Sequence, residues 1–216
     1  MYKKFKVIGV FTGAGTKLSN GIESAIIKNR RESIRVTQQG IEGDSVVNKK
    51  YHGGEMRVIH HYTQVNYDYL KAKFSDISDR FVPGSFGENL LTQELTETEL
   101  NIGDIYSLGT AKVQLTVCRR PCATLNYGYS DDRILKEIIR SGRTGWFYRV
   151  LEDGIVREGD YLTLLESPFP NLPVSKLHDQ GYGLDKFSDH DFLRRCYDTG
   201  LMDKGWKPKL QELLAK

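Results

Sequence analysis

The sequence contains little cysteine, with three residues in a chain of 216. An odd number leaves at least one cysteine unpaired, which argues against a complete disulfide framework and favours a reducing cytoplasm. Long apolar runs are missing as well. No stretch approaches the roughly 20 apolar residues of a membrane-spanning helix, and the apolar residues after the basic N-terminus are interrupted too soon for a signal peptide. We therefore expect a cytoplasmic protein with no membrane partner.

A strong charge of either sign is also missing, because 31 Lys and Arg residues are balanced by 28 Asp and Glu residues, for a formal charge of +3. This excess is too small to indicate binding to a nucleic acid polymer. The chain has no Gly-x-Gly-x-x-Gly fingerprint of a dinucleotide-binding fold and no cysteine spacing typical of iron–sulfur clusters. If the protein carries out redox chemistry, its electrons must come from another molecule.

Short apolar segments separated by turn residues predict a mostly β fold, arranged as a compact barrel rather than as βαβ units. Two helices are expected to interrupt the strands, one over residues 56–74 and one that has Ser130 as its N-cap and ends at Gly142. His60 and His61 fall on the first helix, where neighbouring positions do not face the same point, so we interpret both as structural. The expected strands include residues 5–12, 34–37, 113–117, 146–151 and 159–165.

A proline-rich segment divides the chain, since residues 168–173 hold three of its six prolines. The sequence beyond it has helical character over 174–182, 188–197 and 206–215, with Ser188 as a candidate N-cap. We therefore expect a β-barrel domain over residues 1–166 and a small C-terminal three-helix domain over residues 167–216 that packs against it. Cys196 lies in this tail and is interpreted as structural.

The central candidate for chemistry lies where the strand over 113–117 ends. Arg119, Arg120 and Pro121 follow this strand. Proline cannot donate to a sheet ladder, so the chain leaves the sheet there and Cys122 can point into a pocket. Nearby guanidinium groups favour the thiolate form of a cysteine, and a thiolate is a soft metal ligand. The competing interpretation is a buried cysteine that acts as a small hydrophobe.

A cationic cluster near the N-terminus is a second candidate. Lys28, Arg30 and Arg31 occupy three of four consecutive positions. Such a cluster is either a solvated face of the protein or a site for a phosphate, which arginine binds with two donors and lysine with a point charge.

Two glycine-rich regions, residues 40–54 and 82–90, complete the set of candidate loops. Glycine permits positive φ and close approach of the backbone to a ligand, and exposed N–H groups can bind an anion. Asp44, Glu88 and Asn89 carry the polar side chains of these loops and are interpreted as groups that order them. The alternative is that both regions are ordinary tight turns.

Five motifs occur in a fixed order along the chain and together resemble the MOSC domain, which is named for the C-terminus of molybdenum cofactor sulfurases. The match covers residues 22–166, and the helical tail resembles that of the YiiM-like subgroup. The motifs are Gly40-x-x-Gly43-Asp44, His52-Gly53-Gly54, Pro83-Gly84-x-Phe86-Gly87-Glu88-Asn89-Leu90, Arg119-x-Pro121-Cys122 and Gly142-Arg143-x-Gly145-Trp146-x-x-Arg149-Val150-Leu151-Glu152.

This resemblance implies a MOSC β-barrel with peripheral helices and a molybdenum cofactor, in which a pyranopterin and one protein cysteine hold the metal. The family's metal-binding and catalytic cysteine falls on Cys122, whereas no family cysteine is expected at Cys118. The residues that the resemblance and the loop chemistry together assign to cofactor binding are Lys28, Arg30, Thr37, His52, Gly53, Gly54, Ser85, Phe86, Gly87, Asn89 and Arg120.

The activity implied by the resemblance is the reduction of N-hydroxylated compounds such as 6-N-hydroxylaminopurine, which detoxifies base analogues by removing oxygen and releasing the amine. The cofactor supplies the redox chemistry, and the protein orients the small-molecule substrate. Because the chain lacks its own electron-transfer motifs, an external flavin reductase is the expected electron donor. The oligomeric state is open, and a homodimer is one option.

Two other classes of function remain at this stage. A carrier of the molybdenum cofactor or of sulfur would hold a persulfide on Cys122. A zinc-binding module would use Cys118, Cys122 and His52, but a structural zinc site usually takes four ligands in close sequence pairs, and the Cys-x₃-Cys here has no second pair.

Overall fold

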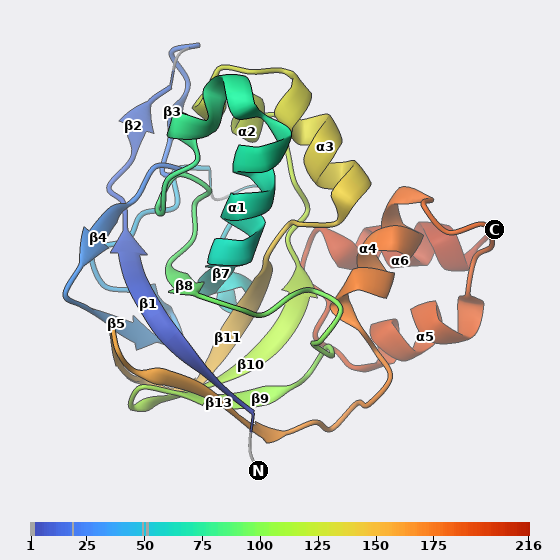
Figure 1. Ribbon diagram of the computed structural model, residues 1–216. Coiled ribbons are helices and arrows are strands. Elements are labelled where there is room, and N and C mark those ends of the chain that lie inside the picture. The colour runs from blue at the N-terminus through green and yellow to red at the C-terminus, as the bar shows by residue number, and fades with distance from the viewer. Residues whose placement is uncertain (1–2, 19, 49, 51) are drawn as a thin grey trace.

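A closed barrel forms the centre of the molecule (Figure 1). The computed structural model describes residues 3–216 except 19, 49 and 51. Within these residues, seven strands surround the core in the order β1-β13-β9-β10-β11-β7-β8, and β1 closes the barrel by pairing with both β8 and β13. Strands β7 and β8 run parallel, and the other neighbours in this described barrel run antiparallel. The barrel strands are β1 (Lys4–Thr12), β7 (Ile59–Thr63), β8 (Leu90–Thr92), β9 (Ile105–Leu108), β10 (Ala111–Cys118), β11 (Trp146–Glu152) and β13 (Tyr161–Glu166).

Shorter strands extend the barrel on one side. β4 (Asn29–Arg31) pairs with the end of β1. A small sheet contains β12 (Gly154–Arg157), β5 (Ser33–Thr37) and β6 (Gly40–Ile41), and a hairpin joins β2 (Thr16–Lys17) to β3 (Glu23–Ser24). The predicted mostly β barrel with peripheral helices is confirmed.

Three helices cover the upper end of the barrel in the view of Figure 1: α1 (Gln64–Lys73), α2 (Thr124–Tyr129) and α3 (Arg133–Ser141). They enclose a second apolar core that includes Tyr67, Leu70 and Ile138. Two 3₁₀ segments, Glu55–Arg57 and Ser75–Arg80, flank β7 and α1.

The predicted helix over residues 56–74 is wrong in its first half. Residues 59–63 form β7, all of whose side chains are buried, and α1 begins only at Gln64. Apolar residues at positions 58, 62 and 65 fit helical spacing, but β7 lies between β8 and β11 and satisfies its backbone through both. Tertiary burial therefore overrides a short periodic pattern, which cannot by itself distinguish a buried strand from a helix.

Two predicted N-caps are also wrong. Ser130 lies at the end of α2, a helix that was not predicted, and adopts a left-handed backbone with φ 52°. Helix α3 begins after Asp132, although it does end at Gly142 as predicted. In the tail, Asp189 rather than Ser188 caps α5, because its carboxylate accepts the N–H of Phe192 at 2.9 Å.

The predicted helical tail is present as α4 (Val174–Tyr182), α5 (His190–Asp198) and α6 (Trp206–Leu214), which pack on the right side of the barrel in Figure 1. Trp206 and Leu177 belong to the same apolar core as Val117 of the barrel. The indole N–H of Trp206 donates to the carbonyl of Cys118 at 2.8 Å. A domain boundary at residue 166 stays a prediction. Among the described residues, no helix combines the length and apolar character needed to cross a bilayer.

Candidate functional site

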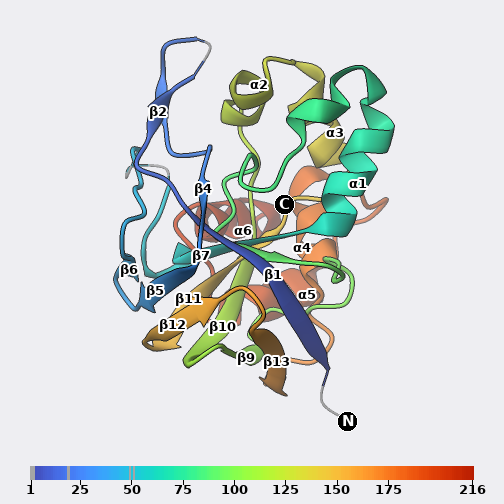
Figure 2. The ribbon, with the colours of Figure 1, turned by 60° about the vertical axis from the view of Figure 1, so that its left-hand side comes forward.

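A pocket of about 190 Å³ is lined by residues from several loops and strand ends. Two elements that contribute lining residues, the β2–β3 hairpin and α2, rise from the same end of the barrel in Figure 2. One wall comes from residues 22–26, which belong partly to this hairpin. Cys122 and Thr124, at the start of α2, also line the pocket, as do Arg119 after β10 and Phe147 on β11. The pocket therefore forms where strand ends and loops from distant parts of the sequence converge.

Cys122 is a half-buried free cysteine in this pocket. Burial alone would raise the pKa of its thiol. A hydrogen bond with the His52 side chain, the positive charge of Arg119 and hydrogen bonds with Thr124 outweigh burial and lower the pKa to about 6. The sulfur lies 3.3 Å from the hydroxyl of Thr124. Near neutral pH, Cys122 is therefore mainly a thiolate, which is the form that attacks electrophiles and binds soft metals.

The other two cysteines differ from Cys122. Cys118 is 1% exposed in the barrel core, and burial raises the pKa of its thiol well above the usual value. Cys196 is buried in the tail, and burial raises its pKa to about 12. Among the described residues, no group of three or more His, Cys, Asp or Glu side chains is arranged to hold a metal ion. The arrangement gives no support to a zinc module built on Cys118, Cys122 and His52.

The thiol pKa leads to a first prediction. In protein made in a host without the cofactor, the rate of Cys122 alkylation by iodoacetamide is expected to rise between about pH 5 and about pH 7 and then level off. The thiolate is the reactive form, and with a pKa of about 6 the thiol is almost fully ionised above about pH 7. Peptide mass spectrometry at each pH measures this rate. His52→Ala should move the midpoint to higher pH, since it removes a stabilising donor. A wild-type midpoint near the free-cysteine value of about 8.5 would contradict the prediction.

Arg119, and not the predicted Arg120, lines the pocket. Its guanidinium donates to the carbonyl of Phe86 at 2.5 Å and lies 4.8 Å from the centroid of the Phe86 ring. Arg120 is exposed and donates to the carbonyl of Gly205 in the tail. Neighbouring residues in extended chain point to opposite sides. From the sequence, this rule predicts that Arg119 and Arg120 point to opposite sides, but it does not say which of them faces a ligand.

Lys28 and Asp44 form a buried ion pair at the pocket wall. The ammonium group of Lys28 lies 2.5 Å from both carboxylate oxygens of Asp44. Burial lowers the pKa of Lys28, and the charge of Asp44 opposes this effect. Asp44 also accepts the N–H of Gly13 and the side-chain amide of Asn89, at 2.8 and 2.9 Å. Asp44 and Asn89 therefore tie three loops together, in agreement with the ordering role expected for them.

Glu88 has the same ordering role in the glycine-rich region over residues 82–90. Its buried carboxylate accepts the N–H groups of Gly84 and Phe86 at 2.5 and 3.2 Å. It also accepts the hydroxyl of Tyr67 on α1 at 2.8 Å. These bonds fix the loop that carries Gly87 and Asn89 to the pocket.

The prediction that His60 and His61 lie on a helix is wrong. They lie on β7, whose successive side chains point to opposite faces. His60 lines the pocket, and burial followed by the charge of Arg119 lowers its pKa well below the usual value, so it is neutral. The ring nitrogens of His61 instead form hydrogen bonds with the hydroxyl groups of Thr92 and Tyr148, at 2.9 and 3.2 Å. A strand assignment over residues 59–63 would have found His60.

The structure brings part of the predicted cofactor-binding set together. Lys28, His52, Gly53, Gly87 and Asn89 line the pocket with Cys122. Arg57 also lines it and was missed, because a lone arginine in a loop has no distinctive sequence signal.

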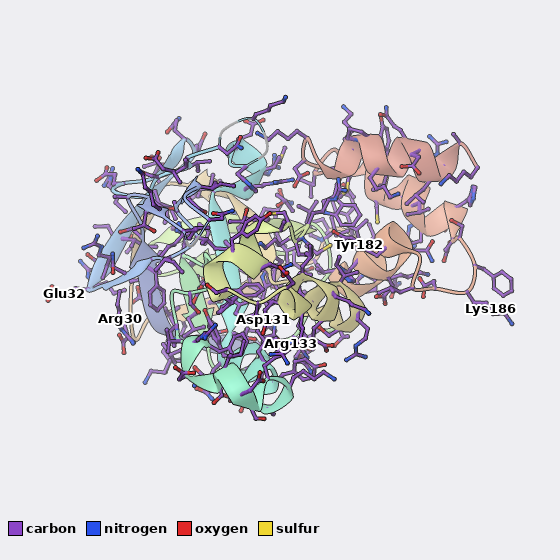
Figure 3. All side chains as sticks on the ribbon, turned by 90° about the horizontal axis from the view of Figure 1, so that it is seen from above. Arg30, Glu32, Asp131, Arg133, Tyr182 and Lys186 are labelled. Carbon is purple, nitrogen blue, oxygen red and sulfur yellow. The ribbon has the colours of Figure 1, made fainter. Side chains whose placement is uncertain are left out.

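Six predicted residues do not line this pocket: Arg30, Thr37, Gly54, Ser85, Phe86 and Arg120. Arg30 lies at the outer edge of β4 (Figure 3) and pairs with Glu158 at 2.6 Å. Thr37 donates to the carbonyl of Gly40 within the β5–β6 turn. Ser85 and Phe86 lie behind the pocket wall, where Phe86 stacks on Tyr62 with the ring centroids 4.1 Å apart.

The model of the MOSC domain family matches residues 48–163 of this chain. Protein YiiM of Escherichia coli is 32% identical over 206 residues, which cover 95% of this chain and 91% of that protein. A Gibberella moniliformis protein named reductase is 36% identical over 159 residues, which cover 73% of this chain but only 28% of that protein.

Solved structures agree with this relationship. The crystal structure of Escherichia coli YiiM matches with a TM-score of 0.80 at 28% identity, over 99% of this chain and 93% of that one. The structure of YiiM from Geobacillus stearothermophilus also gives a TM-score of 0.80, over 98% of this chain and 100% of that one, although at 23% identity it supports the fold alone. The chain therefore belongs to the MOSC domain family, as a YiiM-like member.

Proposed function

We propose that this chain is a molybdenum-cofactor-dependent reductase of N-hydroxylated small molecules, with 6-N-hydroxylaminopurine as an example. The observation that carries the proposal is the Cys122 thiol, whose pKa of about 6 makes it a thiolate at the wall of a pocket. The MOSC family is associated with binding of the molybdenum cofactor, and one relative is named a reductase. Both facts agree with oxidoreductase chemistry at this thiolate.

The residues of the pocket fit a soft metal bound to an anionic organic group. A thiolate is a suitable ligand for a soft metal, whereas magnesium or calcium would need several oxygen donors. Arg57 and Arg119 bring positive charge to the walls, whereas the ammonium of Lys28 and the carboxylate of Asp44 neutralise each other in an ion pair. When bound, the cofactor would supply two-electron oxygen-transfer chemistry.

The protein groups have separate roles in this proposal. Cys122 would hold the metal, and the hydrogen bond with His52 keeps its sulfur ionised. Arg57 and Arg119 would neutralise the anionic cofactor through charge-assisted hydrogen bonds. His60, neutral and buried at the wall, is hydrogen-bonded to the backbone of Thr144 and Gly87, so it would bound the pocket without adding charge.

Elemental and pterin analysis tests the proposal directly. The protein is purified from a host that makes the cofactor and from one whose cofactor synthesis is disrupted. We expect roughly equimolar molybdenum and pterin only in the first preparation, and only that preparation should convert 6-N-hydroxylaminopurine to adenine with an artificial reductant. Metal-free protein from the competent host, or loaded protein inactive on a panel of N-hydroxylated compounds, would refute it.

The electron donor and the assembly are part of the proposal. We propose that an external flavin reductase supplies the electrons, because the sequence lacks dinucleotide-binding and iron–sulfur motifs. A cytoplasmic location and a homodimer are compatible with the sequence. The same reactive thiol also favours a second function, a sulfur carrier, for which a mass increase of one sulfur atom on the Cys122 peptide would be the signature.

Substitutions of Lys28 and Arg30, two cations of the predicted phosphate site, are expected to have different effects on cofactor occupancy. Lys28→Met should lower cofactor occupancy about tenfold, because a charge-assisted hydrogen bond is worth about 1.5–3 kcal/mol. Arg30→Ala is the matched control and should leave occupancy unchanged, since Arg30 is half-exposed and pairs with Glu158 outside the pocket. Molybdenum content per chain measures both. Loss of occupancy in Arg30→Ala would restore the phosphate role that the sequence predicts for it.

A further inference from the structure

The loop between α5 and α6 extends from the helical tail to the pocket. Asp203 in this loop accepts a hydrogen bond from Nε of Arg57 at 2.5 Å, and their side chains are only 4% and 8% exposed. Arg57 lines the pocket, and its guanidinium carbon lies 5.6 Å from the ring centroid of Phe147, another lining residue. The tail therefore supplies a counter-ion to an arginine of the barrel pocket.

Hydrogen bonds within the loop between α5 and α6 fix the orientation of the Asp203 carboxylate. The second oxygen of Asp203 accepts the N–H groups of Gly205 and Trp206 at 2.7 and 2.8 Å. A Cβ at position 205 would lie 2.6 Å from Nη2 of Arg57, so a side chain there would displace the guanidinium. The loop thus presents a carboxylate in a set orientation and leaves room for the guanidinium.

Two further hydrogen bonds join this loop to the flanks of the pocket. Nζ of Lys204 donates to the carbonyl of His52 at 3.0 Å. Nη1 of Arg120, which precedes Cys122 by two residues, donates to the carbonyl of Gly205 at 2.6 Å. The loop therefore contacts the two segments that carry the thiol and its hydrogen-bonding partner.

We propose that Asp203 is a positioning residue, which holds Arg57 at the pocket wall so that its guanidinium faces an anionic group of the bound ligand. Only the identity of that ligand rests on the proposed function. A buried arginine is held strongly by a carboxylate because charge-assisted hydrogen bonds are about twice as strong as neutral ones. The helical tail then contributes to ligand binding although none of its residues lines the pocket.

Cofactor release and amide hydrogen exchange test this proposal. In protein loaded in a cofactor-producing host, Asp203→Asn should release molybdenum and pterin about tenfold faster, the factor expected for loss of one charged hydrogen bond. Asp189→Asn is the matched control, since it breaks the tail ion pair with Lys176 but does not touch the pocket. Combining Asp203→Asn with Arg57→Gln should release the cofactor no faster than Arg57→Gln alone, because Asp203 acts through Arg57.

Hydrogen exchange separates this proposal from the proposed function. In protein made without cofactor, Asp203→Asn should speed exchange of residues 52–58 while the barrel strands stay protected. Unchanged cofactor release in Asp203→Asn, an equal change in Asp189→Asn or fully additive effects in the double variant would overturn the positioning role. If the wild type binds neither molybdenum nor pterin, the proposed function fails, and hydrogen exchange alone then decides: faster exchange supports Asp203, and unchanged exchange overturns it.

Discussion

Cys122→Ser is expected to lower the rate of 6-N-hydroxylaminopurine reduction to the rate given by the artificial reductant alone, while the barrel remains folded. Serine keeps the size of the side chain but replaces a soft thiolate with a hard, un-ionised hydroxyl. Cys122 is half-buried at a pocket wall, so the change leaves the packed core intact. The variant is loaded in a cofactor-producing host, and its activity and its thermal unfolding curve are then both measured.

Cys118→Ser is the matched control, four residues earlier in the chain. Cys118 is 1% exposed in the core, so a hydroxyl there should cost roughly 1–3 kcal/mol of stability but leave most of the activity per folded molecule. If Cys118→Ser is inactive and Cys122→Ser is active, the ligand assignment is wrong. If both variants stay active, no thiolate is required and the molybdenum proposal fails.

Trp206→Ala is expected to lower the free energy of unfolding by about 3–5 kcal/mol, the usual cost of emptying a buried aromatic site. The indole is fully buried between the tail and the barrel. It packs so closely on α4 that a Cβ at Gly181 would lie 2.4 Å from its ring. Its loss also leaves the carbonyl of Cys118 without its donor. Urea denaturation followed by circular dichroism measures the change.

Phe187→Ala controls for loss of an aromatic residue in the tail. Phe187 is 74% exposed, so its removal should change stability by no more than about 0.5 kcal/mol. A loss below about 1 kcal/mol for Trp206→Ala would show that the tail does not share the stability of the barrel. Two separate transitions in either variant would establish residues 167–216 as an independently unfolding domain.

Local chemistry explains why the sequence pointed to Cys122. Proline cannot donate to a sheet ladder, so the chain was expected to leave the sheet near Pro121. The same reasoning could not choose between Arg119 and Arg120, because the choice depends on where residues 22–28, 44–48 and 52–53 come to lie. Those segments reach the pocket through loops whose path no periodic pattern describes. Short-range rules therefore identified the thiol, and only the assembled fold identified its cation.

Long-range pairs set a second limit on what the sequence reveals. Arg57 and Asp203 are 146 positions apart and carry no motif that links them. The strand character of residues 59–63 likewise arises from burial between β8 and β11, which the sequence does not display. In contrast, the strand over 113–117 and the helices of the tail have clear apolar periods, and these elements were predicted correctly.

The closure of the barrel has a consequence for how the chain folds during synthesis. Strand β1 pairs with β8 on one edge, but its other edge pairs with β13, where Phe5 lies opposite Leu162. On that edge β4 pairs early with Val10–Thr12, but Lys4–Lys6 stay unpaired until the ribosome has made about three quarters of the chain, and a free strand edge is a template for aggregation. The long sequence separation also predicts slow folding. We therefore expect aggregation of an incomplete chain to begin at this uncovered part of β1.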